Sequence, residues 1–173
     1  KEMKSDPRVQ LAVPYAVGDN YRGFRIVGTT IEMFTDFEYQ AGRKFEIPAP
    51  GRCFDAGRRE AVLGSIAAGR TGLALGSTFS PYHGVVHDES ARHPEEYVVV
   101  GILAPTGSPS DRVVWIPIEG IFRMKGHVLR GTGAVYEAKP GEAIPDEAKE
   151  VSAVMLKFKK PEAGLFLDQK IKK

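Results

Sequence analysis

The chain has 173 residues, of which 42% are hydrophobic and 27% are charged, as in ordinary globular proteins that bury a core. A net charge of +2, with no long basic run, gives no indication of a nucleic-acid partner. No apolar stretch is long enough to cross a bilayer, and the single cysteine, Cys53, excludes an internal disulfide and a cysteine-based metal site.

The two ends of the chain indicate that it is part of something longer. It begins with Lys1, without an initiating Met or a secretory signal, and it ends on the charged pair Lys172 and Lys173. We therefore expect this segment to be excised from a larger protein.

The first third of the chain predicts two strands and a short helix. An apolar run, 9–13, is stopped by Pro14, and Gly-Asp-Asn at 18–20 predicts a turn. Alternating residues from Tyr21 to Thr29 predict a strand. Two threonines, 29–30, followed by Glu32, predict the capped start of a short helix.

The middle of the chain predicts a strand, a helix and a second strand in close succession. The segment 60–63 predicts a strand, and 66–72 predicts a helix with Ser65 as its N-cap and Gly72 closing it. A further strand is expected at 76–80, followed by a polar loop that contains three histidines.

The stretch from Tyr97 to Phe122 predicts a strand, a turn rich in Pro, Gly and Ser, a second strand closed by Pro117, and a helix over 118–124. Asp111 is expected to cap this turn, which is a structural role. Trp115, in the second strand, is expected in the core, although an exposed Trp would suit an interface.

Towards the C-terminus the signals for helices and strands become weak and then return. Residues 126–149 are punctuated by Gly and Pro and predict little regular structure. The segment 152–158 predicts a strand. Pro161 is placed at the start of a last helix, in which residues 163, 166, 167 and 171 form one apolar face.

Several of these segments, taken in order, resemble one known family. Five motifs occur in the family's order. The first joins 11–14 and 23–29, the second joins 34 and 42–45, and the third joins 60–65 and 76. The fourth is 97–122, and the fifth is 152–157 followed by the last helix. Each alone is an ordinary signal, but together they resemble the extracytoplasmic domain of MacB-like and FtsX-like permeases of ABC transporters. The resemblance covers nearly the whole chain.

The resemblance implies an α+β fold with two parts. Both chain ends, 1–54 and 136–173, would form a porter-like α/β subdomain, and 55–135 would be an inserted, mostly β subdomain. The domain would lie on the periplasmic or extracellular side of a bacterial cytoplasmic (inner) membrane, anchored there by membrane helices and dimeric through them.

The resemblance also implies partners and a mechanism. A cytoplasmic ABC ATPase subunit would drive the membrane helices, and this domain would pass the motion to a substrate, a periplasmic adaptor or a lipoprotein. The cargo and the residues that bind a partner are not readable from the sequence.

The histidines suggest an alternative function, which is binding of a metal ion or another ligand. Three of the four, His83, His87 and His93, lie within eleven residues beside Asp88 and Glu89. Imidazole and carboxylate groups suit Zn, Ni or Cu, so these histidines are candidate metal ligands in a metal- or ligand-binding module. A polar loop with histidines facing water is the competing interpretation, since the spacing matches no standard ligand motif.

The sequence provides no catalytic motif. It contains neither the phosphate-binding GxxxxGK[ST] pattern nor GxSxG, and Cys53 has no histidine near it in sequence. We therefore expect a protein that is not an enzyme and that needs no cofactor, unless the histidine loop binds a divalent metal.

Overall fold

The computed structural model describes residues 5–84, 92–124, 133, 136–139, 142–160 and 162–164. Its strands are β1 (Val9–Tyr21), β2 (Phe24–Thr29), β3 (Glu38–Gln40), β4 (Arg43–Lys44), β5 (Glu60–Leu63), β6 (Thr78–Phe79), β7 (Tyr97–Ile102), β8 (Val113–Pro117) and β9 (Ala153–Phe158). Its helices are α1 (Glu32–Thr35), α2 (Ser65–Thr71), α3 (Ile118–Arg123) and the 3-10 helices η2 (Pro109–Arg112) and η3 (Asp146–Ala148). The predicted α+β class is confirmed.

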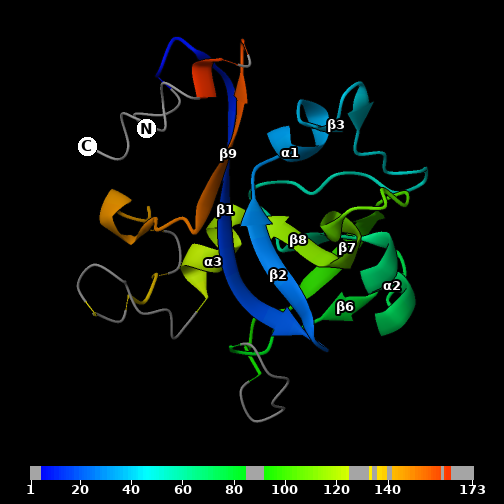
Figure 1. The fold of residues 1–173 in the computed structure, drawn as a ribbon. Helices are drawn as coiled ribbons and strands as arrows, with labels where there is room; N and C mark the ends of the chain where they lie inside the picture. The colour runs from blue at the N-terminus through cyan, green and yellow to red at the C-terminus, as the bar shows by residue number, and fades with distance from the viewer. Residues whose placement is uncertain are drawn as a thin grey trace.

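One mixed sheet organises the described residues (Figure 1). Its strand order is β6-β7-β5-β8-β2-β1-β9, and β3 and β4 form a separate hairpin. The pairs β2–β8 and β5–β7 are parallel, whereas the other pairs are antiparallel. Strands from both predicted subdomains share this sheet, so the sheet marks no boundary between them. The division into two subdomains stays a prediction.

Both faces of the central part of the sheet are buried, because neighbouring residues on each central strand point to opposite cores. Ile26 and Val114 belong to a cluster that α2 and α3 cover. Val27 and Trp115 belong to a second cluster, under α1 and the β3–β4 hairpin. Trp115 is only 3% exposed, which confirms the expected core position.

Strand β1 differs from its prediction because Pro14 does not end it. The Pro14 carbonyl accepts a hydrogen bond from the Thr29 hydroxyl on the side of β2, at 3.0 Å. The missing N–H points to that same side, where regular pairing with β2 begins only at Ala16. The proline therefore removes no bond from the β1–β9 ladder, in which Pro14 faces Val154.

The turn predicted at 18–20 is also wrong. Those residues continue β1 through a bulge between Val17 and Asn20, and the hairpin turn lies at Arg22 and Gly23. Both turn residues have positive φ, 48° and 84°, as a type I′ turn requires. The strand predicted from Tyr21 therefore begins at Phe24.

The predicted helices α1, α2 and α3 are confirmed, although two of their predicted caps are not. No described side chain caps α1, and the Thr29 hydroxyl bonds to Pro14 instead. Helix α2 has Gly64 as its N-cap, and Ser65 is its first residue. Gly72 closes α2 with a φ of 75°, as predicted. Of the predicted C-terminal helix, all but residues 162–164 falls outside the described part of the chain.

Asp111 organises the turn between β7 and β8, which confirms its predicted structural role. Its buried carboxylate accepts hydrogen bonds from the Thr106 N–H, the Thr106 hydroxyl and the Gly107 N–H, at 2.8–3.1 Å. Burial by itself would raise the pKa of Asp111. The hydrogen bonds from Thr106, Gly107 and Ser65 outweigh burial and hold the pKa below its ordinary value.

Gly64 allows this turn to pack against the start of α2. A Cβ atom there would collide with the backbone of Ser110 and Asp111. We expect Gly64→Ala to lower the free energy of unfolding by about 2–3 kcal/mol, because the added atom overpacks a rigid backbone contact. Urea denaturation measures this.

Gly69 provides the matched control. It lies exposed within α2, and a Cβ there would meet nothing within 4 Å. Gly69→Ala should therefore raise the free energy of unfolding by about 0.5–1 kcal/mol, the helix preference of Ala over Gly. Equal effects at the two glycines would contradict the packing argument.

Asp111→Asn should lower the free energy of unfolding at pH 7 by about 2–3 kcal/mol, because an amide cannot accept every hydrogen bond that the carboxylate accepts. Since the folded pKa is depressed, the contribution of Asp111 is complete above the ordinary carboxyl value of 3.8 and is lost as the pH falls through the folded value. The difference from wild type should thus shrink in acid, as followed by urea denaturation at several pH values.

Asp146→Asn serves as control, since that side chain is 56% exposed and pairs with Lys149 at the surface. It should change stability by about 0.5 kcal/mol or less. A pH-independent difference between wild type and Asp111→Asn would refute the role assigned to the charge.

Candidate functional site

Two of the predicted metal ligands, His83 and His93, lie together at the end of β1. Tyr82 makes isolated β-bridges to Asn20 and to Arg92. His83 and His93 follow Tyr82 and Arg92 along these segments, and both side chains contact Asp19. The β1 bulge lies at this point, and Asp19 is buried there.

The side chains form a chain of contacts. His93 Nε2 lies 2.9 Å from Asp19 Oδ2, and His83 Nδ1 lies 3.4 Å from Asp19 Oδ1. On its other side, His93 Nδ1 lies 3.7 Å from Glu95 Oε2. The two imidazole rings meet edge to face, with their centroids 5.6 Å apart.

Burial and charge distinguish the two histidines. Asp19, His93 and Glu95 are buried, whereas the side chain of His83 is 51% exposed. Contact with the Asp19 carboxylate raises the pKa of His93 more than burial lowers it, and the charges of Asp19 and Glu95 raise it further. Two buried carboxylates therefore attract positive charge to this position.

The predicted histidine cluster is found in part. His83 and His93 come together, but His87 lies outside the described residues, as do Asp88 and Glu89. The sequence reasoning missed Asp19, which belongs to the tripeptide taken for a turn, and Glu95. One local signal was present: Glu95 lies two residues after His93.

Asp19, His83 and His93 can hold a metal ion by the chemistry of their donors. One ligand atom from each lies within 4.8 Å of the others. Two imidazoles and a carboxylate form a donor set suited to Zn²⁺. No other such group occurs among the residues that the structure describes.

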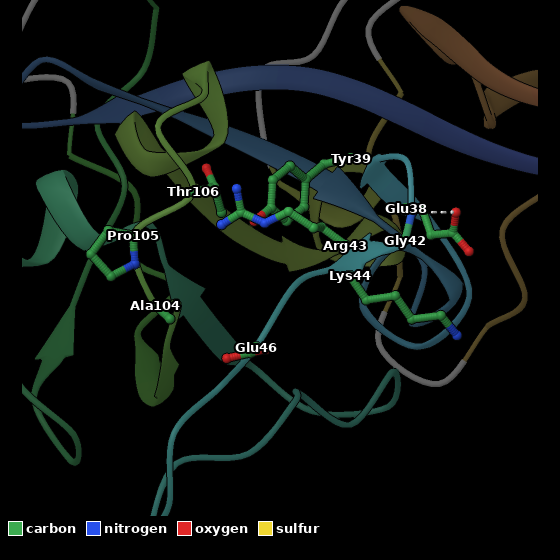
Figure 2. Close-up of a pocket in the computed structure, with 9 residues that line it drawn as sticks. All are labelled: Glu38, Tyr39, Gly42, Arg43, Lys44, Glu46, Ala104, Pro105 and Thr106. Atoms are coloured by element: carbon green, nitrogen blue, oxygen red, sulfur yellow. Dashed lines mark hydrogen bonds between the residues drawn. The ribbon is translucent and has the colours of Figure 1, made fainter.

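A polar pocket of about 340 Å³ lies elsewhere, between the β3–β4 hairpin and the turn after β7. Figure 2 shows Arg43 extending toward Thr106 beside the ring of Tyr39. Glu38, Lys44 and Glu46 give the lining charges of both signs.

Cys53 has the properties of a structural residue. The side chain is half-buried against the core under α1. Burial raises the pKa of the thiol to about 11, so it is protonated at neutral pH. A protonated thiol is a poor nucleophile.

The acidic pair around His93 predicts a clear stability effect. At pH 6 in the presence of EDTA, His93→Gln should lower the free energy of unfolding by about 3 kcal/mol, because two buried carboxylates lose the cation between them. His83→Gln, at the exposed position, should cost about 1 kcal/mol or less. Comparable losses in urea denaturation would show that burial does not distinguish the two histidines.

Comparisons with known proteins agree with this architecture. No protein-family model and no curated protein matches the chain. The extracellular domain of the noncanonic ABC-type transporter YknZ from Gram-positive bacteria is similar, with 16% identity and a TM-score of 0.50 over 98% of this chain and 80% of that one. The periplasmic region of MacB from Actinobacillus actinomycetemcomitans is also similar, with 11% identity and a TM-score of 0.53 over 98% of this chain and 67% of that one.

At these identities the similarity lies in the fold. The predicted resemblance to MacB-like domains is therefore confirmed at that level: the chain has the α+β fold of the extracytoplasmic domains of these two ABC-type transporters.

Proposed function

We propose that this chain is the extracytoplasmic domain of an ABC transporter permease. The observation that carries the proposal is the fold, which extends over 98% of the chain in both comparisons. In this function the domain passes ATPase-driven motion of membrane helices to a substrate or to a partner outside the membrane.

The arrangement of the first and last strands gives independent support. Strand β1 lies beside β9 (Figure 1), and Val9 pairs with Phe158. Just beyond them, the Lys159 N–H donates to the Arg8 carbonyl at 3.0 Å. The chain therefore enters and leaves the sheet at the same end, as a domain attached at both ends to membrane helices requires. Within the described residues, no helix is itself long and apolar enough to cross a membrane.

The proposal includes the location and the partners. The domain lies in the periplasm or outside the cell, on a bacterial cytoplasmic membrane, and its permease pairs with a cytoplasmic ATPase subunit. An adaptor or lipoprotein binds outside, and the membrane part supplies a dimer contact. The two chain ends, 1–54 and 136–173, form the porter-like subdomain and 55–135 the insert.

The central position of the 97–122 segment is consistent with a rigid lever. This segment supplies β7, β8 and α3, and β8 joins β5 to β2 in the middle of the sheet. A force applied at the paired ends of β1 and β9 is transmitted through this sheet as a unit, because both of its faces are packed.

A second candidate function is a module that binds a metal or another ligand. The juxtaposition of Asp19, His83 and His93 favours it. The two functions are compatible, since a metal site can lie in a transporter domain.

The test of location uses the full-length protein in intact cells. In a Cys53→Ser background, a single cysteine is introduced as Arg70→Cys on the exposed side of α2. A membrane-impermeant maleimide should label it without permeabilisation. Labelling only after permeabilisation would place the domain in the cytoplasm and overturn the proposal.

The test of motion uses the same variant with its ATPase partner in nanodiscs. A spin label at position 70 on both copies of the permease should report a distance distribution that shifts when ATP hydrolysis is trapped with vanadate. A distribution that is identical in all nucleotide states would contradict transmission of motion through this domain.

A further inference from the structure

We propose that Asp19, His83 and His93 bind one Zn²⁺ ion, with Glu95 orienting His93. The site goes beyond the transporter function and does not depend on it. It would join the end of β1 to the two segments that flank the loop between β6 and β7.

The distances between donors fit one ion. Bonds of about 2.0–2.1 Å in tetrahedral geometry keep neighbouring ligand atoms about 3.3–3.5 Å apart. Asp19 Oδ1 lies 3.4 Å from His83 Nδ1, and Asp19 Oδ2 lies 2.9 Å from His93 Nε2. One donor atom from each of the three residues lies within 4.8 Å of the others, so one ion can be shared among them.

The surroundings of His93 are those of a metal ligand. Histidines that bind a metal through one nitrogen commonly direct the other to a carboxylate, which fixes the ring. His93 directs Nε2 to Asp19 and Nδ1 to Glu95, whose side chain is 11% exposed. At 3.7 Å, Glu95 Oε2 is at ion-pair distance from Nδ1 and beyond hydrogen-bond range, so we assign Glu95 the role of a supporting carboxylate rather than that of a ligand.

Asp19 is likewise held in place. Its Oδ1 accepts a hydrogen bond from the Gly84 N–H at 3.1 Å, next to His83. Asn20 and Tyr82 exchange backbone hydrogen bonds of 2.8 and 3.0 Å, which fix the two segments relative to each other. The His93 N–H donates to the Pro81 carbonyl at 2.8 Å. The backbone thus presets the donors before a metal arrives.

Charge and donor type select the metal. Asp19 and Glu95 place two carboxylates in a buried position, which a divalent cation would neutralise. Two imidazoles and one carboxylate favour Zn²⁺ over Mg²⁺ and Ca²⁺, which prefer oxygen ligands. Three protein ligands leave the fourth tetrahedral position for water or for a donor from another molecule.

The experiment is isothermal titration of the metal-free 173-residue chain with Zn²⁺. We expect one ion per chain. His83→Ala, His93→Ala and Asp19→Asn should each weaken binding roughly 100-fold, and Glu95→Gln should weaken it about 10- to 100-fold without changing the stoichiometry. His127→Ala, which removes the histidine outside the loop, should bind as wild type does.

Thermal unfolding provides a second measurement that detects misfolded variants. At a free Zn²⁺ concentration 100-fold above the dissociation constant, the midpoint of the wild type should rise by about 5–10 °C. The Asp19→Asn and His83→Ala variants should unfold cooperatively and show no such rise, and Mg²⁺ should have no effect. Absence of a one-to-one complex, or a complex that survives these two substitutions, would overturn the proposal.

Discussion

The structure depends above all on the two-sided pairing of β1. Its first half pairs with β9 and its second half with β2, so this strand alone attaches the last strand to the rest of the sheet. The change of partner takes place at Pro14 to Ala16, where a residue without an N–H is tolerated because neither ladder needs that donor. The paired first and last strands and the histidine cluster lie at opposite ends of this strand.

At its beginning, β1 brings the first and last strands together. The pairing of Val9 with Phe158 fixes the direction in which both chain ends leave the sheet. A domain built in this way moves as one body when its two ends are displaced together, since the packed faces of the sheet resist shear. The pairing therefore joins the fold to the proposed transmission of motion.

At its far end, the β1 bulge turns Asp19 toward the histidines. The register of β1 with β2 shifts between Val17 and Asn20, and Asp19 and Asn20 are both buried there. Asn20 bonds to the backbone of residues 82 and 84, and Asp19 contacts both histidines. The buried cluster of charges thus lies at an irregularity in the strand.

The sequence by itself determined helices α1, α2 and α3 and most strands, because hydrophobic period and turn residues act locally. Gly72 closes α2 through its own backbone freedom, and Asp111 caps its turn with neighbours only a few residues away. The sequence also indicated the α+β fold, through motifs in a fixed order. Where local signals misled, as at Pro14 and at 18–20, pairing with a distant strand overrode them.

Only the tertiary structure decided the membership of the candidate site. Asp19 lies 64 residues before His83 and Glu95 two residues after His93, so no spacing rule connects the four. They meet because Tyr82 bridges Asn20 on one side and Arg92 on the other. The physical reason is general: local sequence specifies backbone conformation over a few residues, whereas the convergence of side chains from distant segments is set by strand register.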